Sequence, residues 1–122
     1  MIYTIKKLYF NLINSINGLK LGLKEHSFLI EIIGGFILLP YVFISNMEEF
    51  YKISIIIVYL LLLAFELINS SIEKLSDKIT KSIDSDIKTV KDLSSSAVFI
   101  VLMLLIFLII ISLWINNKGV EN

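Results

Sequence analysis

Apolar residues gather into three long runs along the chain, and a stretch of mixed character precedes them. The runs cover about residues 28–45, 50–71 and 93–115. Each approaches the roughly 20 apolar residues that a helix needs to cross the hydrocarbon of a bilayer. In the preceding stretch, about residues 5–25, apolar side chains recur every three or four positions between lysines and asparagines. This spacing predicts an amphipathic helix lying on the membrane surface.

The three runs differ in how cleanly apolar they are. The third contains no charged residue and ends near Trp114, an aromatic residue suited to the membrane interface. The second is apolar until Glu66, and the first contains Glu31 and Pro40. The polar segment 74–92 predicts an extension of the second helix followed by a turn at about 82–86. We therefore expect residues 1–122 to form one all-α membrane domain, with a surface helix and three transmembrane helices.

Composition and charge support this interpretation and orient the chain. Hydrophobic residues make up 57% of the sequence, which is too apolar for an ordinary soluble domain. There is no cysteine, which excludes disulfides, thiolate metal sites and cysteine nucleophiles. All eleven cations are lysines; four precede the first run and five lie between the last two. By the positive-inside tendency, the N-terminus and segment 74–92 are predicted to lie in the cytoplasm.

A stripe of polar residues ends the second run. Glu66, Asn69, Ser70, Glu73 and Asp77 fall within about one third of a helix circumference, at about 100° per residue. Ionisable residues at membrane depth are costly and usually face a protein interior or a watery cavity, which makes them functional candidates. Glu66, the deeper acid, is a candidate general base. Glu73, nearer the cytoplasm, is a candidate ligand for a hard cation such as Mg²⁺, and Asn69 can orient a ligand or a carboxylate.

Two further polar groups lie on the predicted cytoplasmic side. Glu25 precedes the first run and could complete a cation site with Glu73. Lys91 and Asp92 come just before three serines, 94–96, at the entry to the third membrane helix, where Asp92 could also serve as an N-cap. A lysine with hydroxyls beside a helix N-terminus can hold phosphate. Carboxylates, a metal and a lysine at a membrane boundary suit phosphoryl transfer to a lipid hydroxyl.

Nucleotide-binding signatures of the soluble kinases are absent. Neither G-x-x-x-x-G-K-[ST] nor the protein-kinase signature set occurs in the sequence. The segment from Glu66 to Asp77 resembles instead the E-x-x-N-[ST]-x-I-E-x-x-x-D signature of the prokaryotic integral-membrane diacylglycerol kinases. Lys91-Asp92 with the residues 95–98 resembles that family's K-D-x-x-S-A-A-V motif, and residues 25–31 resemble its E-x-A-F-R-Q-E stretch. The resemblance extends over nearly the whole chain.

The resemblance implies where the protein lies, how it assembles and which reaction it catalyses. It implies a multi-pass protein of the bacterial inner (cytoplasmic) membrane, with a cytoplasmic N-terminus and composite active sites between the protomers of a homotrimer. The implied reaction is the ATP-dependent phosphorylation of diacylglycerol to phosphatidic acid with Mg²⁺. No nucleic-acid partner is expected.

The resemblance also assigns a role to each matching polar residue. Glu66 would accept the proton of the lipid hydroxyl, and Glu25 and Glu73 would ligate the metal that bridges the ATP phosphates. The residues expected to contact ATP are Glu25, Asn69, Glu73, Lys91 and Asp92. Those expected to contact the lipid are Glu31, Glu66 and Ser95, and Asp77 would support the site.

Departures from the family pattern leave alternatives open. Leu29 and Ile30 stand where the pattern has Arg and Gln, and Ser94 replaces a small glycine. One alternative is an undecaprenol kinase of the same family, although the R-N-F-R-I-H-like stretch typical of those enzymes is absent. The other is a non-catalytic small oligomeric membrane protein that uses the acidic stripe to join helices or to bind a cation.

Overall fold

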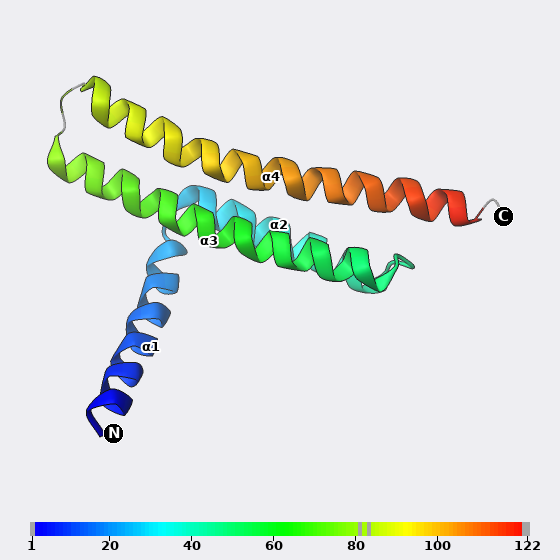
Figure 1. The fold of residues 1–122 in the computed structure, drawn as a ribbon, viewed down its shortest axis with the longest axis horizontal. Coiled ribbons are helices and arrows are strands. Elements are labelled where there is room, and N and C mark those ends of the chain that lie inside the picture. Colours follow the sequence, from blue (N-terminus) through cyan, green and yellow to red (C-terminus); the bar gives the residue numbers. More distant parts are fainter. Residues whose placement is uncertain (1, 81, 83, 121–122) are drawn as a thin grey trace.

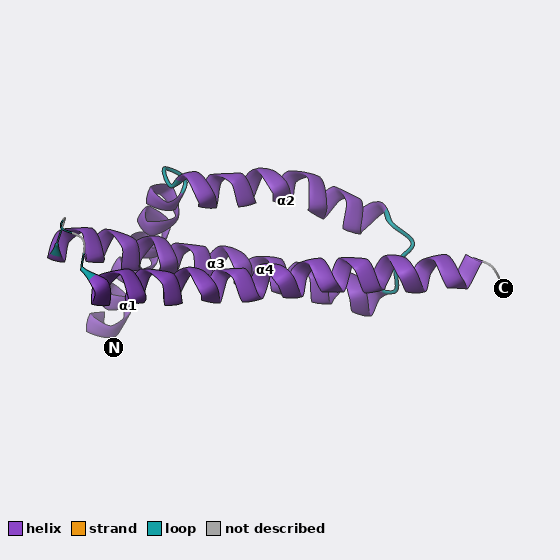
Figure 2. Cartoon of the chain, turned by 90° about the horizontal axis from the view of Figure 1, so that it is seen from above, coloured by secondary structure: helices purple, strands orange, loops and turns teal. Residues whose placement is uncertain are grey.

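The described residues of the computed structural model form four helices in sequence: α1 (Ile2–Gly22), α2 (His26–Ile44), α3 (Glu49–Ile79) and α4 (Ser85–Val120) (Figure 1). The structure describes residues 2–80, 82 and 84–120, with side chains for 3–80, 82 and 84–117. No strand occurs in the described ranges, as the cartoon of Figure 2 also shows. The predicted all-α fold is confirmed.

Three of these helices are long and apolar enough to cross a membrane, namely α2, α3 and α4. The 31 residues of α3 correspond to about 46 Å of helix at 1.5 Å per residue, which exceeds the roughly 30 Å thickness of bilayer hydrocarbon. One end of α3 must therefore project beyond the hydrocarbon. The polar character of its last two turns identifies that end as the C-terminal one.

Helix α3 is the centre of the packing. It runs antiparallel to α4 along most of its length and contacts α2 as well (Figures 1 and 2). Seven apolar residues form the buried cluster between these helices, and four of them belong to α3: Val42, Met47, Ile55, Val58, Tyr59, Leu62 and Leu105. Because one face of α3 is covered by both neighbours, the polar residues on that face are also withdrawn from solvent.

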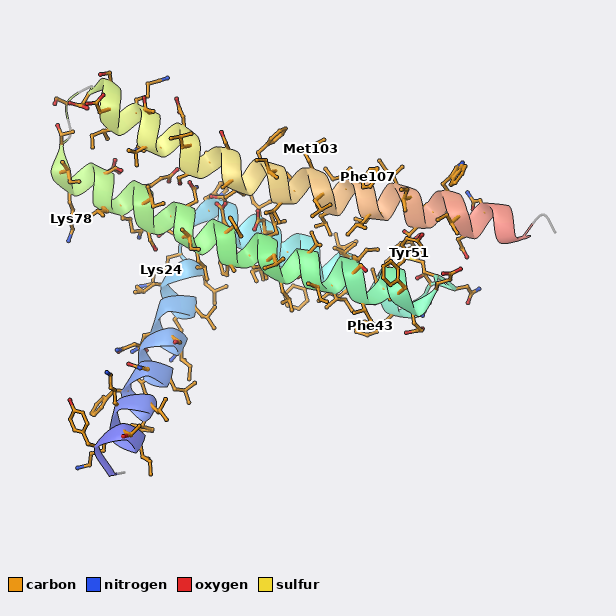
Figure 3. All side chains as sticks on the ribbon, in the orientation of Figure 1. Lys24, Phe43, Tyr51, Lys78, Met103 and Phe107 are labelled. Carbon is orange, nitrogen blue, oxygen red and sulfur yellow. The ribbon has the colours of Figure 1, made fainter. Side chains whose placement is uncertain are left out.

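Much of the apolar surface of α4 faces away from its neighbours. Met103 and Phe107 are 47% and 57% exposed and lie on the outer side of α4 in Figure 3. A helix that is apolar around most of its circumference is stable in lipid, or against another apolar helix, but not in water. This surface therefore agrees with a membrane environment for α4.

Helix α1 projects away from the other three at a steep angle (Figure 1). Its last residue, Gly22, is buried, and a Cβ atom there would collide with the side chains of Leu67 and Phe28. Glycine thus allows the end of α1 to approach α3 closely. Residues 23–25 then turn the chain into α2, which places Glu25 directly at the junction of α1, α2 and α3.

Helix α4 begins earlier than the apolar pattern indicates. The backbone N–H groups of Asp86 and Ile87 donate to Oδ1 of Asp84 at 2.9 and 3.0 Å, which is the geometry of a helix N-cap. Helix α4 therefore starts at Ser85 and carries polar residues for about two turns before its apolar part. The turn expected at 82–86 includes residue 83, which lies outside the described residues.

Candidate active site

The polar stripe of α3 faces the interior of the helix bundle. Glu66 is 3% exposed, and Asn69 and Ser70 are 8% and 7% exposed. They share the face of Tyr59 and Leu62, which are also buried. Further along α3, Glu73 is half-buried and Asp77 is exposed. The stripe therefore runs from a water-excluded end at Glu66 to a solvent-exposed end at Asp77.

Helix α2 brings a second acid to the buried end of the stripe. Glu31 lies close enough to Glu66 for the two carboxyl groups to interact electrostatically. One carboxyl oxygen of Glu31, Oε2, is buried and has no hydrogen-bond partner among the described residues. A buried polar atom without a partner is costly, and it is satisfied when a ligand supplies the missing group. The Glu31–Glu66 pair is therefore a place where a hydroxyl group can bind.

Asn69 connects the acids of α3 to α4. Its Nδ2 donates to Oε1 of Glu73 at 3.5 Å, and its Oδ1 accepts a hydrogen bond from the hydroxyl of Ser94. The amide thus orients a carboxylate, as the sequence suggested, and at the same time joins two helices. In the sequence, Ser94 was noted as one of the three serines after Lys91 and Asp92 and as a departure from the family pattern, but not as a partner of Asn69. Its serine hydroxyl, at a position where that pattern has glycine, was the available signal for this contact.

Glu25 pairs with a lysine that sequence reasoning did not select. The Nζ atom of Lys74 lies 2.5 Å from Oε1 of Glu25, and Lys74 directly follows Glu73. The structure thereby brings Glu25 to the part of α3 that carries Glu73. Nothing in the sequence distinguishes Lys74 from the neighbouring lysines, because its partner lies in a different segment of the chain.

The acidic residues fit a magnesium–nucleotide complex better than a metal held by protein alone. Within the described residues, no group of three or more histidine, cysteine, aspartate or glutamate side chains could hold a metal ion. Mg²⁺ is commonly bound by one or two carboxylates together with substrate phosphates. Glu25 and Glu73 can supply such a pair of carboxylates. Their donor chemistry therefore fits the implied metal.

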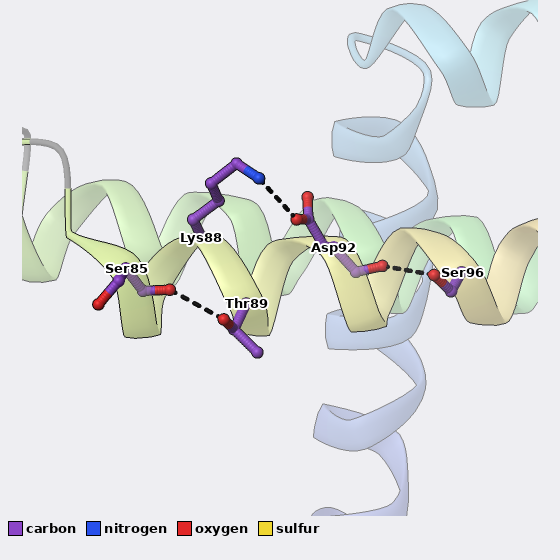
Figure 4. A network of polar contacts seen from close by, with 5 residues as sticks. All are labelled: Ser85, Lys88, Thr89, Asp92 and Ser96. Atoms are coloured by element: carbon purple, nitrogen blue, oxygen red, sulfur yellow. Dashed lines mark hydrogen bonds and ion pairs between the residues drawn. The ribbon is translucent and has the colours of Figure 1, made fainter.

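The residues Lys91 and Asp92 contact different partners. Lys91 Nζ lies 3.0 Å from Asp77 Oδ1 and so links α4 to α3, whereas Asp92 Oδ2 accepts from Lys88 Nζ at 3.1 Å within α4 (Figure 4). Lys91 also lies within electrostatic reach of Glu73. The structure thus joins Lys91 to the acidic stripe and leaves Asp92 at its edge.

The prediction of a helix N-terminus at Lys91 and Asp92 is wrong, and so is that of Asp92 as an N-cap. Helix α4 starts at Ser85, and Asp84 supplies the cap. The hydroxyl of Ser96 donates to the carbonyl oxygen of Asp92, a bond within the helix interior (Figure 4). The free N–H groups of a helix lie only in its first turn. Any phosphate binding here must therefore rely on side chains. The prediction failed because the apolar pattern marks the membrane border and not the start of the helix.

Ser95 is a candidate that the structure does not connect to the acidic stripe within the described residues. It is exposed on α4, and no hydrogen bond joins it to another candidate residue in the described part of the chain. Its expected contact with lipid stays a prediction.

Two cavities adjoin the stripe, and they differ in character. A cavity of about 510 Å³ lies between α1 and α3, with apolar walls that include Leu19 and Leu67 and a polar end at Glu25 and Lys74. A second cavity, of about 340 Å³, lies between the C-terminal end of α3 and the N-terminal end of α4. Its lining includes the charged residues Asp77, Asp84, Lys88, Lys91 and Asp92.

A comparison with family models identifies the chain. The model of the prokaryotic diacylglycerol kinases matches residues 13–114, which include every candidate residue described above. The chain belongs to the prokaryotic diacylglycerol kinase family. A comparison with curated proteins found no match. The resemblance inferred from the sequence motifs is therefore confirmed, and the three apolar helices fit the membrane-bound character of this family.

The family match places the chain in a family of lipid kinases, and its three apolar helices agree with a multi-pass membrane protein. It does not favour the alternative of a non-catalytic oligomer. The structure adds a physical reason, since two acids withdrawn from water, the buried Glu66 and the half-buried Glu31, are a costly way to join helices that apolar residues could join instead.

Proposed function

We propose that this kinase transfers the γ-phosphoryl group of ATP to the hydroxyl group of diacylglycerol, giving phosphatidic acid. The reaction takes place at the cytoplasmic boundary of the bacterial inner membrane, with the N-terminus in the cytoplasm. The observation that carries the proposal is the placement of Glu66, which is 3% exposed and faces Glu31 within the matched region. A buried acid beside a free carboxyl oxygen suits the deprotonation of a bound hydroxyl.

The proposed chemistry gives the two acids different tasks. Glu31 holds the acceptor hydroxyl through Oε2, the oxygen without a partner in the described chain. The hydroxyl oxygen forms a bond to the γ-phosphorus, and the bond from that phosphorus to the oxygen of the leaving ADP breaks. The hydroxyl proton passes to the carboxylate of Glu66. Positioning and charge neutralisation supply most of the rate enhancement in such transfers.

The charged cavity between α3 and α4 supports a nucleotide site. Lys91 lines it and lies within electrostatic reach of Glu73, so a phosphate held by Lys91 would lie beside the acidic stripe. Glu25 and Glu73 would hold Mg²⁺, which supplies neutralisation of phosphate charge when it is bound with the nucleotide. Asn69 keeps the Glu73 carboxylate oriented for this task.

The apolar cavity between α1 and α3 supports access for a lipid. Leu19 and Leu67 offer apolar surface, and the ion pair of Glu25 and Lys74 lines the same cavity with charged groups. Such a combination suits an acylated molecule whose head group stays near the cytoplasm.

Undecaprenol is the second candidate acceptor. Leu29 and Ile30, next to Glu31, are apolar and 39% and 54% exposed, where the family pattern has two polar residues. An apolar rim favours an acceptor hydroxyl attached to a hydrocarbon chain over one attached to an ester-bearing glycerol.

The assay is phosphorylation by the purified protein in mixed micelles with ATP labelled at the γ-phosphate. We expect label in diacylglycerol, and the ratio of kcat/KM for the two acceptors measures their preference. Absence of label from both lipids would contradict the proposed kinase activity. Preferential labelling of undecaprenol would assign the second candidate acceptor.

The homotrimer with composite sites is part of the proposal. Its support is the outward-facing apolar surface of α4, which a second copy could cover. Light scattering combined with a measurement of bound detergent gives the protein mass of the particle. A mass of one protomer in an active preparation would contradict the trimer.

A further inference from the structure

Helices α2 and α3 approach each other closely at Gly35. A Cβ atom at Gly35 would collide with the hydroxyl end of Tyr59, whereas a Cβ atom at the neighbouring Gly34 would meet nothing within 4 Å. Tyr59 is 5% exposed, so its ring fills the space that the missing side chain of Gly35 leaves. The contact therefore sets how near α2 can come to α3 at this level.

The same tyrosine bonds to the backbone of Glu31. Its hydroxyl donates to the carbonyl oxygen of Glu31 at 3.1 Å. Residues 31 and 35 are one helical turn apart, so Tyr59 contacts both ends of the turn that carries Glu31. A buried tyrosine hydroxyl requires a partner, and here that partner belongs to a candidate site residue.

Tyr59 and Glu66 share the buried face of α3. Seven residues separate them, which is about two turns, or roughly 10 Å, along the axis. This stretch of α3 thus carries Glu66 at one end and Tyr59, which is hydrogen-bonded to the backbone of Glu31, at the other. No contact of Tyr59 with a substrate is needed for it to influence the distance between the two carboxyl groups.

We propose that Tyr59 is a positioning residue of this kinase. Its hydroxyl bond to Glu31 and its fit against Gly35 fix the depth of Glu31 relative to Glu66, so that one bound hydroxyl reaches both carboxyl groups. The inference rests on the proposed function for its effect on catalysis. The geometric part, that Tyr59 places Glu31, can be tested without turnover.

The kinetic test uses two variants and two matched controls. Tyr59→Phe removes the hydrogen bond to Glu31, and Gly35→Ala blocks the close approach of α2 to α3. The matched controls are Tyr51→Phe, which alters a tyrosine nearer the start of α3, and Gly34→Ala, which adds a Cβ atom in open space. We expect kcat to fall about tenfold or more in the first two variants with KM for ATP unchanged, because small displacements of reacting groups are costly. The kcat of each control variant should stay within about twofold of that of the unaltered protein. Equal rates for Tyr59→Phe and Tyr51→Phe would overturn the proposal.

The second measurement distinguishes positioning from general loosening of the bundle. A hydrophobic carbodiimide reacts with carboxyl groups inside membranes, and mass spectrometry gives the extent of labelling at Glu31 and Glu66 separately. We expect Tyr59→Phe to change labelling of Glu31 relative to Glu66, while Tyr51→Phe leaves the ratio unchanged. An unchanged ratio in Tyr59→Phe would overturn the positioning role. If the unaltered protein phosphorylates no lipid, the proposed function fails, and the labelling ratio still decides the placement of Glu31.

Discussion

The two ends of the acidic stripe are held in place by different means. At the membrane end, Glu31 and Glu66 lie between packed helices, with Tyr59 bonded to the backbone that carries Glu31. At the opposite, more exposed end, Glu25 and Asp77 are held by ion pairs with lysines. Packed helices are displaced only at high cost, whereas exposed ion pairs contribute little free energy and exchange readily.

This difference matches the different demands of two substrates. A lipid hydroxyl is uncharged and needs a preformed site that excludes water. A nucleotide brings several negative charges and must find cations that can leave their present partners. In the proposed site, Lys91 can exchange Asp77 for a phosphate group, and Glu25 can exchange Lys74 for the Mg²⁺ that accompanies the nucleotide. The proposed function therefore assigns the acceptor to the end fixed by packing and the nucleotide to the end held by exchangeable ion pairs.

The largest expected effect comes from breaking the membrane end. Glu66→Gln removes the proposed proton acceptor and keeps the size of the side chain, so we expect kcat to fall by about 100- to 10,000-fold. The measurement is label transfer in mixed micelles, with helix content checked by circular dichroism. Glu48→Gln, at the exposed start of α3, is the matched control. A Glu66→Gln variant with more than a tenth of the original rate would remove Glu66 from the role of base.

A smaller effect is expected at the nucleotide end. Lys91→Met deletes the cation that would hold phosphate, and a charge-assisted hydrogen bond is worth about 1.5–3 kcal/mol, so KM for ATP should rise about tenfold or more. The saturation curve for ATP, at fixed lipid, gives this value. Lys78→Met removes a different exposed lysine of the same region and should leave KM unchanged. An equal rise in both variants would point to general electrostatic attraction of the nucleotide instead of a specific contact.

The smallest effect concerns the lysine that pairs with Glu25. Lys74→Met frees that carboxylate from a competing cation, so the Mg²⁺ concentration for half-maximal activity should fall. The pair is partly exposed and contributes at most about 1 kcal/mol, which limits the change to about fivefold. Lys24→Met is the control, since Lys24 precedes Glu25 but forms no ion pair within the described residues. An increased requirement for Mg²⁺ would show that Lys74 supports the metal ligand and does not compete with the metal.

The sequence alone was sufficient to predict the features that follow from a membrane environment. Long apolar runs predicted the three helices because uncharged helices are nearly the only chain segments that hydrocarbon accepts. The buried position of Glu66 followed from the same cost, applied to an acid. Motif spacing then predicted the family, which the match over residues 13–114 confirms.

Contacts between distant segments could not be found in this way. The pairing of Tyr59 with Gly35 depends on the separation and rotation of α2 and α3, and apolar residues alone leave both undetermined. The start of α4 was missed for a different reason. Outside the hydrocarbon a helix can continue through polar residues, so hydropathy marks the border of the membrane and the cap at Asp84 marks the start of the helix.

The unbroken course of α3 has a consequence for membranes of different thickness. A helix longer than the hydrocarbon adjusts to a thinner bilayer by tilting or by deforming the lipid around it. Glu66 and Glu73 lie on one continuous helix, so such a tilt carries both acids together and preserves their spacing along the axis. The two ends of the proposed site therefore stay in register with each other while their common depth follows the bilayer.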